Sequence, residues 1–290
     1  MKKNIKIAIA GGKGGTGKTL VSTNLFQLLK EKGKNVELID CDAEEPNDLL
    51  FFKGKHSGHK DVLLPVPQID TSLCTYCGKC KEYCNYHAIF LIPFAKQIKV
   101  IEELCHGCGA CTIACEYGAI TEKEVFIGEV NQYRISDKAL LTEARMRVGV
   151  YSPVDTVKEA LRFNTNPPEY QLLDAPPGTS CPFIHSVVHA DYVLLVSEPT
   201  PFGLSDLKQT IGVLQEMKKS YGVIINRSDV GNDEMKQYLQ QENISLVAEI
   251  PFDKDIASAY AKGKLCINEL PAYTPVFEKI INHVNQEICK

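Results

Sequence analysis

A glycine-rich loop near the start constrains the fold of this chain more than any other feature. Residues 12–19, with the sequence GKGGTGKT, fit the pattern G-x-x-x-x-G-K-[ST]. Ile5, Ile7 and Ile9 alternate before the loop as in a strand, and a helix is predicted after it, over 18–32. Such a loop surrounds a phosphate with inward-facing backbone N–H groups, and the following helix points its positive end at the same anion. The sequence therefore predicts a phosphate-binding loop between a strand and a helix.

Each position of this loop has an expected role in holding a nucleotide. Lys18 is expected to reach the β- and γ-phosphates, and the Thr19 hydroxyl is expected to bind Mg²⁺. A chance glycine-rich turn is the alternative, but the strand before the loop and the helix after it argue against that reading. The remaining positions bring their backbone close to the phosphates, and they are Gly12, Gly14, Gly15, Thr16 and Gly17.

Short apolar segments continue the alternation of strand and helix through most of the chain. Because such strands are buried on both faces, the pattern predicts an α/β fold with a mostly parallel, doubly wound sheet and helices on both sides. Further strands are predicted over residues 36–39, 170–173, 192–196, 223–225 and 246–250.

Residues 68–125 interrupt this alternation and contain an internal repeat. The segment CTYCGKCKEYCNYHAI from Cys74 matches CHGCGACTIACEYGAI from Cys105, at an offset of 105 − 74 = 31 residues. Each half is too small to hold a core alone, so the repeat predicts a small module stabilised by metal. The predicted domains are 1–65 and 126–290 for a discontinuous nucleotide-binding domain, and 66–125 for an inserted module.

The repeat contains eight of the twelve cysteines, each half with the spacing C-x₂-C-x₂-C-x₃-C. This spacing resembles that of bacterial ferredoxins, which are small α+β proteins, and in them the fourth cysteine of each run ligates the other [4Fe–4S] cluster. Structural zinc is the alternative, although zinc gains nothing from a third and a fourth cysteine at these positions. The predicted ligand sets are Cys74, Cys77, Cys80 and Cys115 for one cluster, and Cys105, Cys108, Cys111 and Cys84 for the other.

One departure from the ferredoxin pattern lies just after each run. Proline usually follows the fourth cysteine there, whereas this chain has Asn85 and Glu116. The change should alter hydrogen bonding near the sulfur atoms, and so the reduction potential, without preventing cluster binding.

A second lysine in the glycine-rich loop carries a family resemblance. The run from Lys13 to Thr19, KGGTGKT, resembles the deviant Walker A signature of the MinD/ParA/Mrp and nitrogenase-iron-protein superfamily of ATPases. The resemblance implies that Lys13 reaches across a dimer interface to the partner's nucleotide, so that ATP holds two subunits together. A solvated loop lysine is the alternative.

Two acidic segments extend this resemblance. Asp40-Cys41-Asp42 resembles the family's switch I, where Asp42 is implied to orient the attacking water and Asp40 to support the metal shell. The segment from Asp174 to Gly178, DAPPG, resembles the Walker B end and switch II. There Asp174 is implied to contact Mg²⁺ through water, and the Gly178 N–H to sense the γ-phosphate.

Two segments near the end resemble the base-binding part of the same family. Asn226-Arg227 matches its adenine-binding pair, with Asn226 as the base reader, and Pro251 lies in a turn that resembles the one beside the base. The resemblance thus covers nearly all of the chain outside the insert, and it implies ATP and Mg²⁺ as ligands.

Charge and hydropathy exclude several classes of partner. The formal net charge is −4, and no basic block is longer than a pair of lysines, so a nucleic-acid partner is not expected. The first ten residues form too short an apolar run for a signal peptide, and no segment approaches the roughly 20 apolar residues of a membrane span. A cytoplasmic protein with no membrane partner is predicted, and in that compartment a dense block of thiols indicates metal.

A few residues belong to no recognised motif. Cys181, three residues after Gly178, is either a metal ligand at a dimer interface or a small buried hydrophobe. His185 and His189 are expected on one helix, as surface or core residues. A C-terminal helix with apolar residues at helical spacing is expected to pack on the domain.

The function predicted from these features is that of an ATPase coupled to electron transfer. ATP binding is expected to close a homodimer and hydrolysis to reset it, which would change how the ferredoxin part meets a redox partner protein. The alternative is an Mrp-like ATPase that delivers a metallocluster to an apo-acceptor. The DAPPG segment favours that alternative, and the lack of a C-terminal C-x-x-C counts against it. A positioning ATPase with structural clusters is the third possibility.

Overall fold

The computed structural model describes residues 4–289. Its internal contacts divide the chain into two units. The large unit contains the residues up to His59, Val130–Arg145, and the residues from Val154 onward. The cysteine unit contains Lys60–Glu129 and Met146–Pro153.

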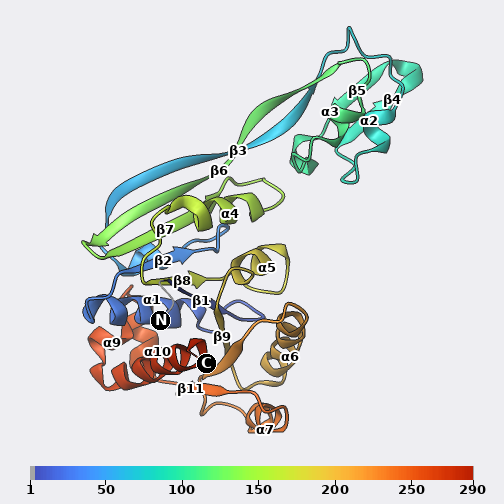
Figure 1. Cartoon of the computed structure of the whole chain (residues 1–290). Coiled ribbons are helices and arrows are strands. Elements are labelled where there is room, and N and C mark those ends of the chain that lie inside the picture. Colours follow the sequence, from blue (N-terminus) through green and yellow to red (C-terminus); the bar gives the residue numbers. More distant parts are fainter. Residues whose placement is uncertain (1–3, 290) are drawn as a thin grey trace. The chain divides into compact units, whose positions relative to one another are not determined.

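One nine-stranded sheet has the strand order β11-β10-β9-β1-β8-β2-β7-β6-β3 (Figure 1). The seven strands from β11 to β7 all run parallel to one another, which confirms the predicted mostly parallel sheet. The strands are β1 (Ile5–Ala10), β2 (Val36–Asp40), β3 (Lys55–Ile69), β6 (Ile120–Ser136), β7 (Ala139–Met146), β8 (Tyr170–Asp174), β9 (Tyr192–Ser197), β10 (Tyr221–Asn226) and β11 (Leu246–Ile250).

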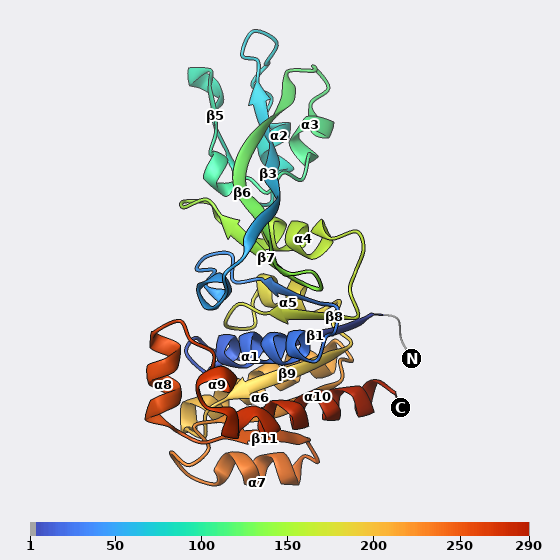
Figure 2. The same ribbon diagram turned by 90° about the vertical axis from the view of Figure 1, so that its left-hand side faces the viewer.

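Helices cover both faces of the parallel part of the sheet (Figures 1 and 2). On one face α1 packs against β1, β2 and β8, and α10 packs beside α1; on the other face α5 and α6 pack against β8, β1 and β9. The helices of this unit are α1 (Lys18–Glu31), α4 (Val154–Phe163), α5 (Cys181–Val187), α6 (Pro201–Glu216), α7 (Glu234–Gln241), α8 (Lys254–Ala261), α9 (Cys266–Glu269) and α10 (Thr274–Ile288).

The core of the large unit lies between α1, α10 and the sheet. Leu25 and Phe26 of α1 are completely buried there, as are Ile7 and Ile9 of β1. The predicted packing of the C-terminal helix is confirmed, because Phe277 of α10 and the apolar residues that follow it at helical spacing join the same core. Among the described residues, no helix is both long enough and apolar enough to cross a membrane.

Three strands were not expected from the sequence: β3, β6 and β7. β6 and β7 are joined by the two residues 137 and 138, a loop length that makes neighbouring strands antiparallel. The sequence of β7 does not look like a buried strand, because some of its buried side chains are polar. Thr142 of β7 donates a hydrogen bond of 2.7 Å to Glu37 of β2. Gln171 of β8 donates to the other oxygen of Glu37, at 2.9 Å. A buried carboxylate thus joins three strands where an apolar side chain would be expected.

The cysteine unit has short elements around a small core. A β-hairpin, β4 (Ile89–Ile92) with β5 (Gln97–Val100), lies beside two short helices, α2 (Lys79–Glu82) and α3 (Ala110–Ala114). The buried core consists of two apolar side chains and two cysteines: Ile89, Ile120, Cys80 and Cys111. So small a core contributes little burial, and a bound metal group is the usual means by which units of this size become stable.

The two units do not divide at the predicted residues. The insert was predicted over 66–125, whereas the cysteine unit begins at Lys60 and also includes Met146–Pro153. The difference arises because β3 and β6 are longer than expected and each continues from one unit into the other.

Candidate nucleotide and metal sites

A cavity of about 480 Å³, here called the loop cavity, lies at the carboxyl ends of the parallel strands of the large unit. In open α/β sheets this edge is where ligands bind. Sequence-predicted residues from distant segments meet there, and those that line it are Gly14, Gly15, Gly17, Lys18, Thr19, Asp42, Asp174, Asn226, Arg227 and Pro251.

Asn226 holds the glycine-rich loop in place. Its amide Nδ2 donates a hydrogen bond of 2.9 Å to the Thr16 carbonyl. Gly17 has a φ of +101°, and a Cβ there would lie 2.4 Å from that same amide nitrogen. Only glycine allows this approach, so the end of β10 fixes the conformation of the loop.

Lys18 lies inside the loop rather than in solvent. Its side chain is buried, and Nζ donates to the Lys13 carbonyl at 3.2 Å. Burial lowers the pKa of the Lys18 ammonium, while the nearby Asp174 and Asp42 carboxyls act in the opposite direction. A buried cation with one weak neutral partner is arranged to bind an anion such as a phosphate.

Thr19 and Asp174 place oxygen ligands side by side. Thr19 Oγ1 donates a hydrogen bond of 2.8 Å to Asp174 Oδ2. The other carboxylate oxygen of Asp174 is buried and accepts no hydrogen bond from an N–H or O–H donor. Burial raises the pKa of Asp174 to about 6. A hydroxyl and a partly unsatisfied carboxylate suit Mg²⁺, which prefers oxygen ligands together with phosphate.

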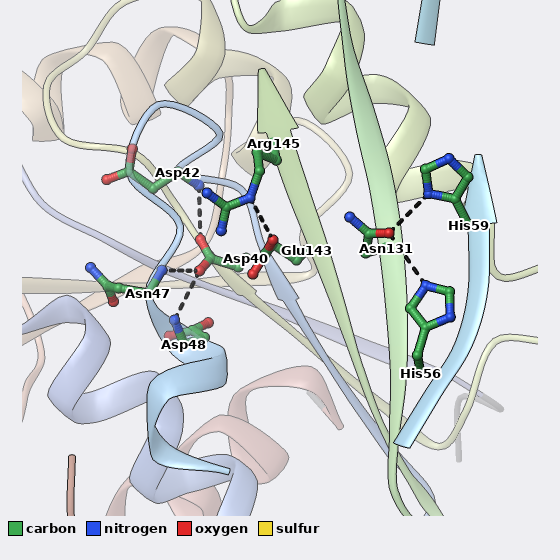
Figure 3. A network of polar contacts seen from close by, with 9 residues as sticks. All are labelled: Asp40, Asp42, Asn47, Asp48, His56, His59, Asn131, Glu143 and Arg145. Carbon is green, nitrogen blue, oxygen red and sulfur yellow. Dashed lines mark hydrogen bonds and ion pairs between the residues drawn. The ribbon is translucent and has the colours of Figure 1, made fainter. Parts of the chain in front are cut away.

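Asp40 has a different position from the predicted metal contact (Figure 3). It is fully buried and does not line the loop cavity. Its two carboxylate oxygens accept hydrogen bonds from the backbone N–H groups of Asp42 at 3.1 Å, Asn47 at 2.8 Å and Asp48 at 3.0 Å. Asp40 therefore holds the loop that follows β2, and so positions Asp42 at the cavity.

Asp48 is the polar residue that sequence reasoning missed. It is completely buried, and neither of its carboxylate oxygens has a donor partner. Burial raises its pKa well above the usual range, and the neighbouring Asp40 and Asp174 carboxyls raise it further. The raised pKa favours the protonated form of Asp48 beside these two carboxyls. The only sequence feature that could have indicated Asp48 is the presence of an acidic residue in a short apolar run.

Replacing Asp48 with asparagine is expected to stabilise the metal-free protein at high pH. The folded state holds a proton on Asp48 that the unfolded state releases near pH 3.8, so wild-type stability falls as the pH rises above that value. Asparagine removes this dependence. The melting temperature of D48N should exceed that of the wild type by about 3 °C or more at pH 8, the shift that about 1 kcal/mol produces in a domain of this size. The difference should shrink towards pH 4.

Thermal unfolding in EDTA under anaerobic conditions measures this difference. Asp253→Asn is the matched control, because Asp253 is a partly exposed acid whose pKa is lowered by its hydrogen bonds. Melting curves of D48N and wild type that stay equally spaced from pH 4 to pH 8 would contradict the prediction.

Acidic residues from three adjacent strands lie in one row. Asp40 is in register with Asp174 of β8 on one side and with Glu143 of β7 on the other. Arg145 lies beside this row, and its Nε donates to Glu143 Oε1 at 2.9 Å (Figure 3). β7 thus brings an ion pair next to the carboxyl group that holds the switch-like loop after β2.

An apolar side of the loop cavity was also missed. Phe252, Ile256 and Tyr260, on α8 and the turn before it, line the cavity. Asn226 and Pro251 lie on the same lining. A flat apolar part of a ligand, such as a nucleobase, fits this wall. The amphipathic pattern of α8 was the sequence feature that could have indicated this wall.

Four other predicted residues lie outside the loop cavity. Gly12 is close to α6, where a Cβ would lie 2.6 Å from Asp206 Cβ, and Lys13 is half-buried on the loop. Gly178 lies in the connection between β8 and α5, with a φ of +87°. Thr16 is buried within the loop. The implied role of Lys13 in a dimer and of Gly178 as a phosphate sensor remain predictions.

Cys181 and the two histidines differ from some of the expectations. Cys181 is exposed at the start of α5, so it is not the buried hydrophobe that was one of its two interpretations. His185 lies on α5, whereas His189 lies in the turn after that helix, so the two do not share a helix.

Two further cavities lie in the cysteine unit, and each is lined by four cysteines. The first cysteine cavity has Cys74, Cys77, Cys80 and Cys115 in its lining. The second cysteine cavity has Cys84, Cys105, Cys108 and Cys111. Each set takes three residues from one half of the repeat and the fourth from the other half, as the sequence predicts.

The surroundings of these sulfur atoms fit a metal group. None of the eight cysteines forms a disulfide. Backbone N–H groups of Tyr76, Ala88 and Gly107 point at cysteine sulfur atoms at 3.3–3.4 Å. Burial raises the pKa of the Cys80 and Cys111 thiols, so the thiolates need a cation to form. Four sulfur donors with N–H partners suit an iron–sulfur cluster.

Comparisons with known proteins agree with the geometry of the large unit. The model of the CobQ/CobB/MinD/ParA nucleotide binding domain matches residues 7–266. An uncharacterised protein of Methanocaldococcus jannaschii is 33% identical over 290 residues, which cover 98% of this chain and 99% of that protein. An iron-sulfur cluster carrier protein of Pyrococcus horikoshii is 20% identical over 317 residues, with 98% and 88% covered.

A solved structure shares the same fold. The septum site-determining protein MinD of Pyrococcus horikoshii, complexed with Mg-ADP, superposes with a TM-score of 0.59. The two chains are 18% identical, and the match covers 97% of this chain and 96% of the other.

Proposed function

Because the chain belongs to the CobQ/CobB/MinD/ParA nucleotide-binding family, we propose that it is an ATP-hydrolysing iron–sulfur protein that couples its nucleotide state to electron transfer. The nucleotide-binding part follows from the family and from the loop cavity. The observation that carries the redox part is that two crossed sets of four cysteines each line one cavity.

In the nucleotide reaction, water attacks the γ-phosphorus of ATP and ADP leaves with the bridging oxygen. Lys18 neutralises charge that develops on the phosphates, and the loop N–H groups hold the same oxygens. Thr19 and Asp174 are the residues that would hold Mg²⁺. Asp42, which lines the loop cavity, would orient the water.

In the redox part, the first cysteine cavity would hold one [4Fe–4S] cluster and the second would hold another. When bound, each cluster accepts or donates one electron. The chain's own residues supply four thiolates to each cluster and N–H donors to some of their sulfur atoms. A reduced donor protein would supply each electron, and an acceptor protein would remove it. Zinc would bind the same thiolates but carries no electron.

The covalent order of the chain supports coupling between the two parts. The cysteine unit is inserted between Asp42 and Asp174, two of the acidic residues that line the loop cavity. Before the insert, the chain passes through the loop that Asp40 holds. After the insert, the chain forms β7, which pairs directly with β2. A nucleotide that shifts this loop therefore acts on both connections to the insert.

ATP-dependent pairing of two copies is part of this proposal. Lys13 is half-buried on the loop and does not line its own chain's cavity, which suits a lysine that completes the site of a partner copy. A homodimer formed with ATP would then open after hydrolysis.

Cluster delivery to an apo-acceptor protein is the second candidate. The similarity to an iron-sulfur cluster carrier protein favours it. The chain has no C-x-x-C pair outside the insert, which counts against it. Stable clusters would support electron transfer, and clusters that move quantitatively to an apo-ferredoxin would support delivery.

Anaerobic redox titration of the reconstituted protein by EPR, with iron counting, tests the proposed function. We expect eight irons per chain and two [4Fe–4S] signals whose midpoint potential or line shape changes on addition of MgATP. The MgATP titration of K18A is the control, since that variant should lose the change and keep its iron. Signals that ignore MgATP, or bound zinc in place of iron, would count against the proposal.

A further inference from the structure

A cavity of about 380 Å³ in the large unit is separate from the loop cavity. We call it the basic cavity. It lies between the sheet and helices α4 and α5, and no residue of its lining belongs to the lining of the loop cavity. Its lining residues are Lys6, Ile39, Lys158, Leu161, Arg162, Gln171, Leu173, His185, Val188 and His189.

Every ionisable side chain that lines this cavity is a base. Lys6 comes from β1, Lys158 and Arg162 lie one helical turn apart on α4, and the two imidazoles come from α5 and the turn after it. Of these, Lys158 has an acidic partner in Asp155, at 3.3 Å. Several cations that converge on one concave surface from separate elements repel one another until an anion binds.

The nearby acids do not line the cavity. Glu37 lies behind Gln171 and is completely buried, with hydrogen bonds from Thr142, Gln171 and Asn164. Asp191 accepts a hydrogen bond of 2.9 Å from the Lys6 backbone N–H. These carboxylates are held by donors of their own and leave the basic side chains free to meet a ligand.

A buried acceptor without a partner lies in the same lining. Gln171 is 3% exposed, and its Nε2 donates to Glu37. Its Oε1 is buried and has no hydrogen-bond partner in the structure. An unsatisfied buried carbonyl is disfavoured, so a ligand with an O–H or N–H donor gains by supplying one. The unpartnered Gln171 carbonyl is an observation independent of the basic side chains.

The remaining lining is apolar. Ile39, Leu161 and Leu173 form it with Val188, and Ile39 and Leu173 are also part of the buried sheet. A volume of this size fits a small organic molecule rather than a bare inorganic ion. The basic side chains, the unpartnered Gln171 carbonyl and the apolar residues together indicate the chemistry of one ligand.

We propose that the basic cavity binds a small organic anion, which has a phosphate or carboxylate group for Lys6 and Arg162, an apolar body, and a hydrogen-bond donor for Gln171. Such a site does not depend on the proposed redox function. Its floor residues Ile39 and Leu173 directly precede Asp40 and Asp174 in the sequence, so ligand in the cavity packs against the two strands that lead to the loop cavity.

Phenyl phosphate is a suitable first probe, because it combines an anionic group with an apolar ring. The full-length protein, labelled at the histidine imidazoles and saturated with MgADP to occupy the loop cavity, is titrated with the probe and followed by NMR. We expect the resonances of His185 and His189 to shift, and a dissociation constant below about 1 mM, which is modest for a pocket with two charge-assisted contacts. Benzyl alcohol, the neutral analogue, and inorganic phosphate, which lacks the ring, should each bind at least about tenfold more weakly.

Arg162→Gln and Lys6→Gln test the assignment of the anionic end. Arg162 is exposed, so its replacement should leave the fold intact, and each change should weaken probe binding about tenfold. Lys279→Gln, at an exposed position on α10, is the matched control and should bind as the wild type does. Absence of imidazole shifts at 5 mM probe (a concentration about five times the expected constant), or equal affinity in R162Q, K6Q and wild type, would overturn the proposal.

Discussion

Replacing Lys18 with alanine should lower the rate of ATP hydrolysis by at least about a hundredfold, as the loss of one buried charge-stabilising donor does in other enzymes. In the structure this ammonium is buried in the loop cavity and donates to the Lys13 carbonyl. Alanine leaves the cavity without a side-chain cation from the glycine-rich loop. Phosphate release measured at saturating MgATP, with MgADP affinity measured in parallel, checks the prediction.

Lys13→Ala provides the matched comparison within the same loop. Lys13 does not line the loop cavity, so K13A should still bind MgATP within about threefold of wild type, a change of less than 1 kcal/mol. Its expected defect is the loss of ATP-dependent association, which light scattering detects. A K18A protein that hydrolyses ATP at the wild-type rate would remove Lys18 from the site. A K13A protein that dimerises normally would remove only the proposed role of Lys13.

The second large effect is expected from pairs of cysteine substitutions. If each cavity holds one cluster, the variant C77A/C115A loses two ligands of the same cluster and keeps the other intact. The variant C77A/C84A has the same number of substitutions but loses one ligand from each cluster. EPR spin counting of the reduced proteins should therefore find one [4Fe–4S] signal per chain in the first variant and no intact signal in the second.

This comparison separates crossed ligation from ligation within each half of the repeat. Cys115 lines the same cavity as Cys77, whereas Cys84 lines the other cavity. Ligation within each half would give the opposite result, with the intact signal in C77A/C84A. The wild-type protein and C289A, a variant at an exposed cysteine outside both cavities, should each show two signals.

The parts of the fold that follow from local patterns could be predicted from the sequence. Strands such as β8 are short and apolar, and their carboxyl ends meet at one edge of the sheet, so Lys18, Thr19 and Asp174 could be expected to lie together. The crossed cysteine sets were predicted from the resemblance of each run to the bacterial ferredoxin pattern, in which the fourth cysteine ligates the other cluster.

The missed parts depend on contacts between distant segments. β6 contains many charged residues, and pairing in a sheet rather than apolar periodicity determines its length. Asp48 looks like an ordinary surface acid until the loop after β2 folds over Asp40. The basic cavity takes residues from six separate elements and turns, none with a recognisable spacing. Only the folded chain brings such residues together.

The two strands that lead into and out of the cysteine unit are neighbours in the sheet, and this arrangement has a genetic consequence. Gly54 lies against Ile135, and Gly58 lies against Gln132, so β3 and β6 run in opposite directions. Two such strands are ordinarily closed by a turn of a few residues. The whole insert therefore occupies the place of a hairpin loop. A gene could acquire or lose this cassette by a single recombination event, while the order of the parallel strands and the ATP site stay the same.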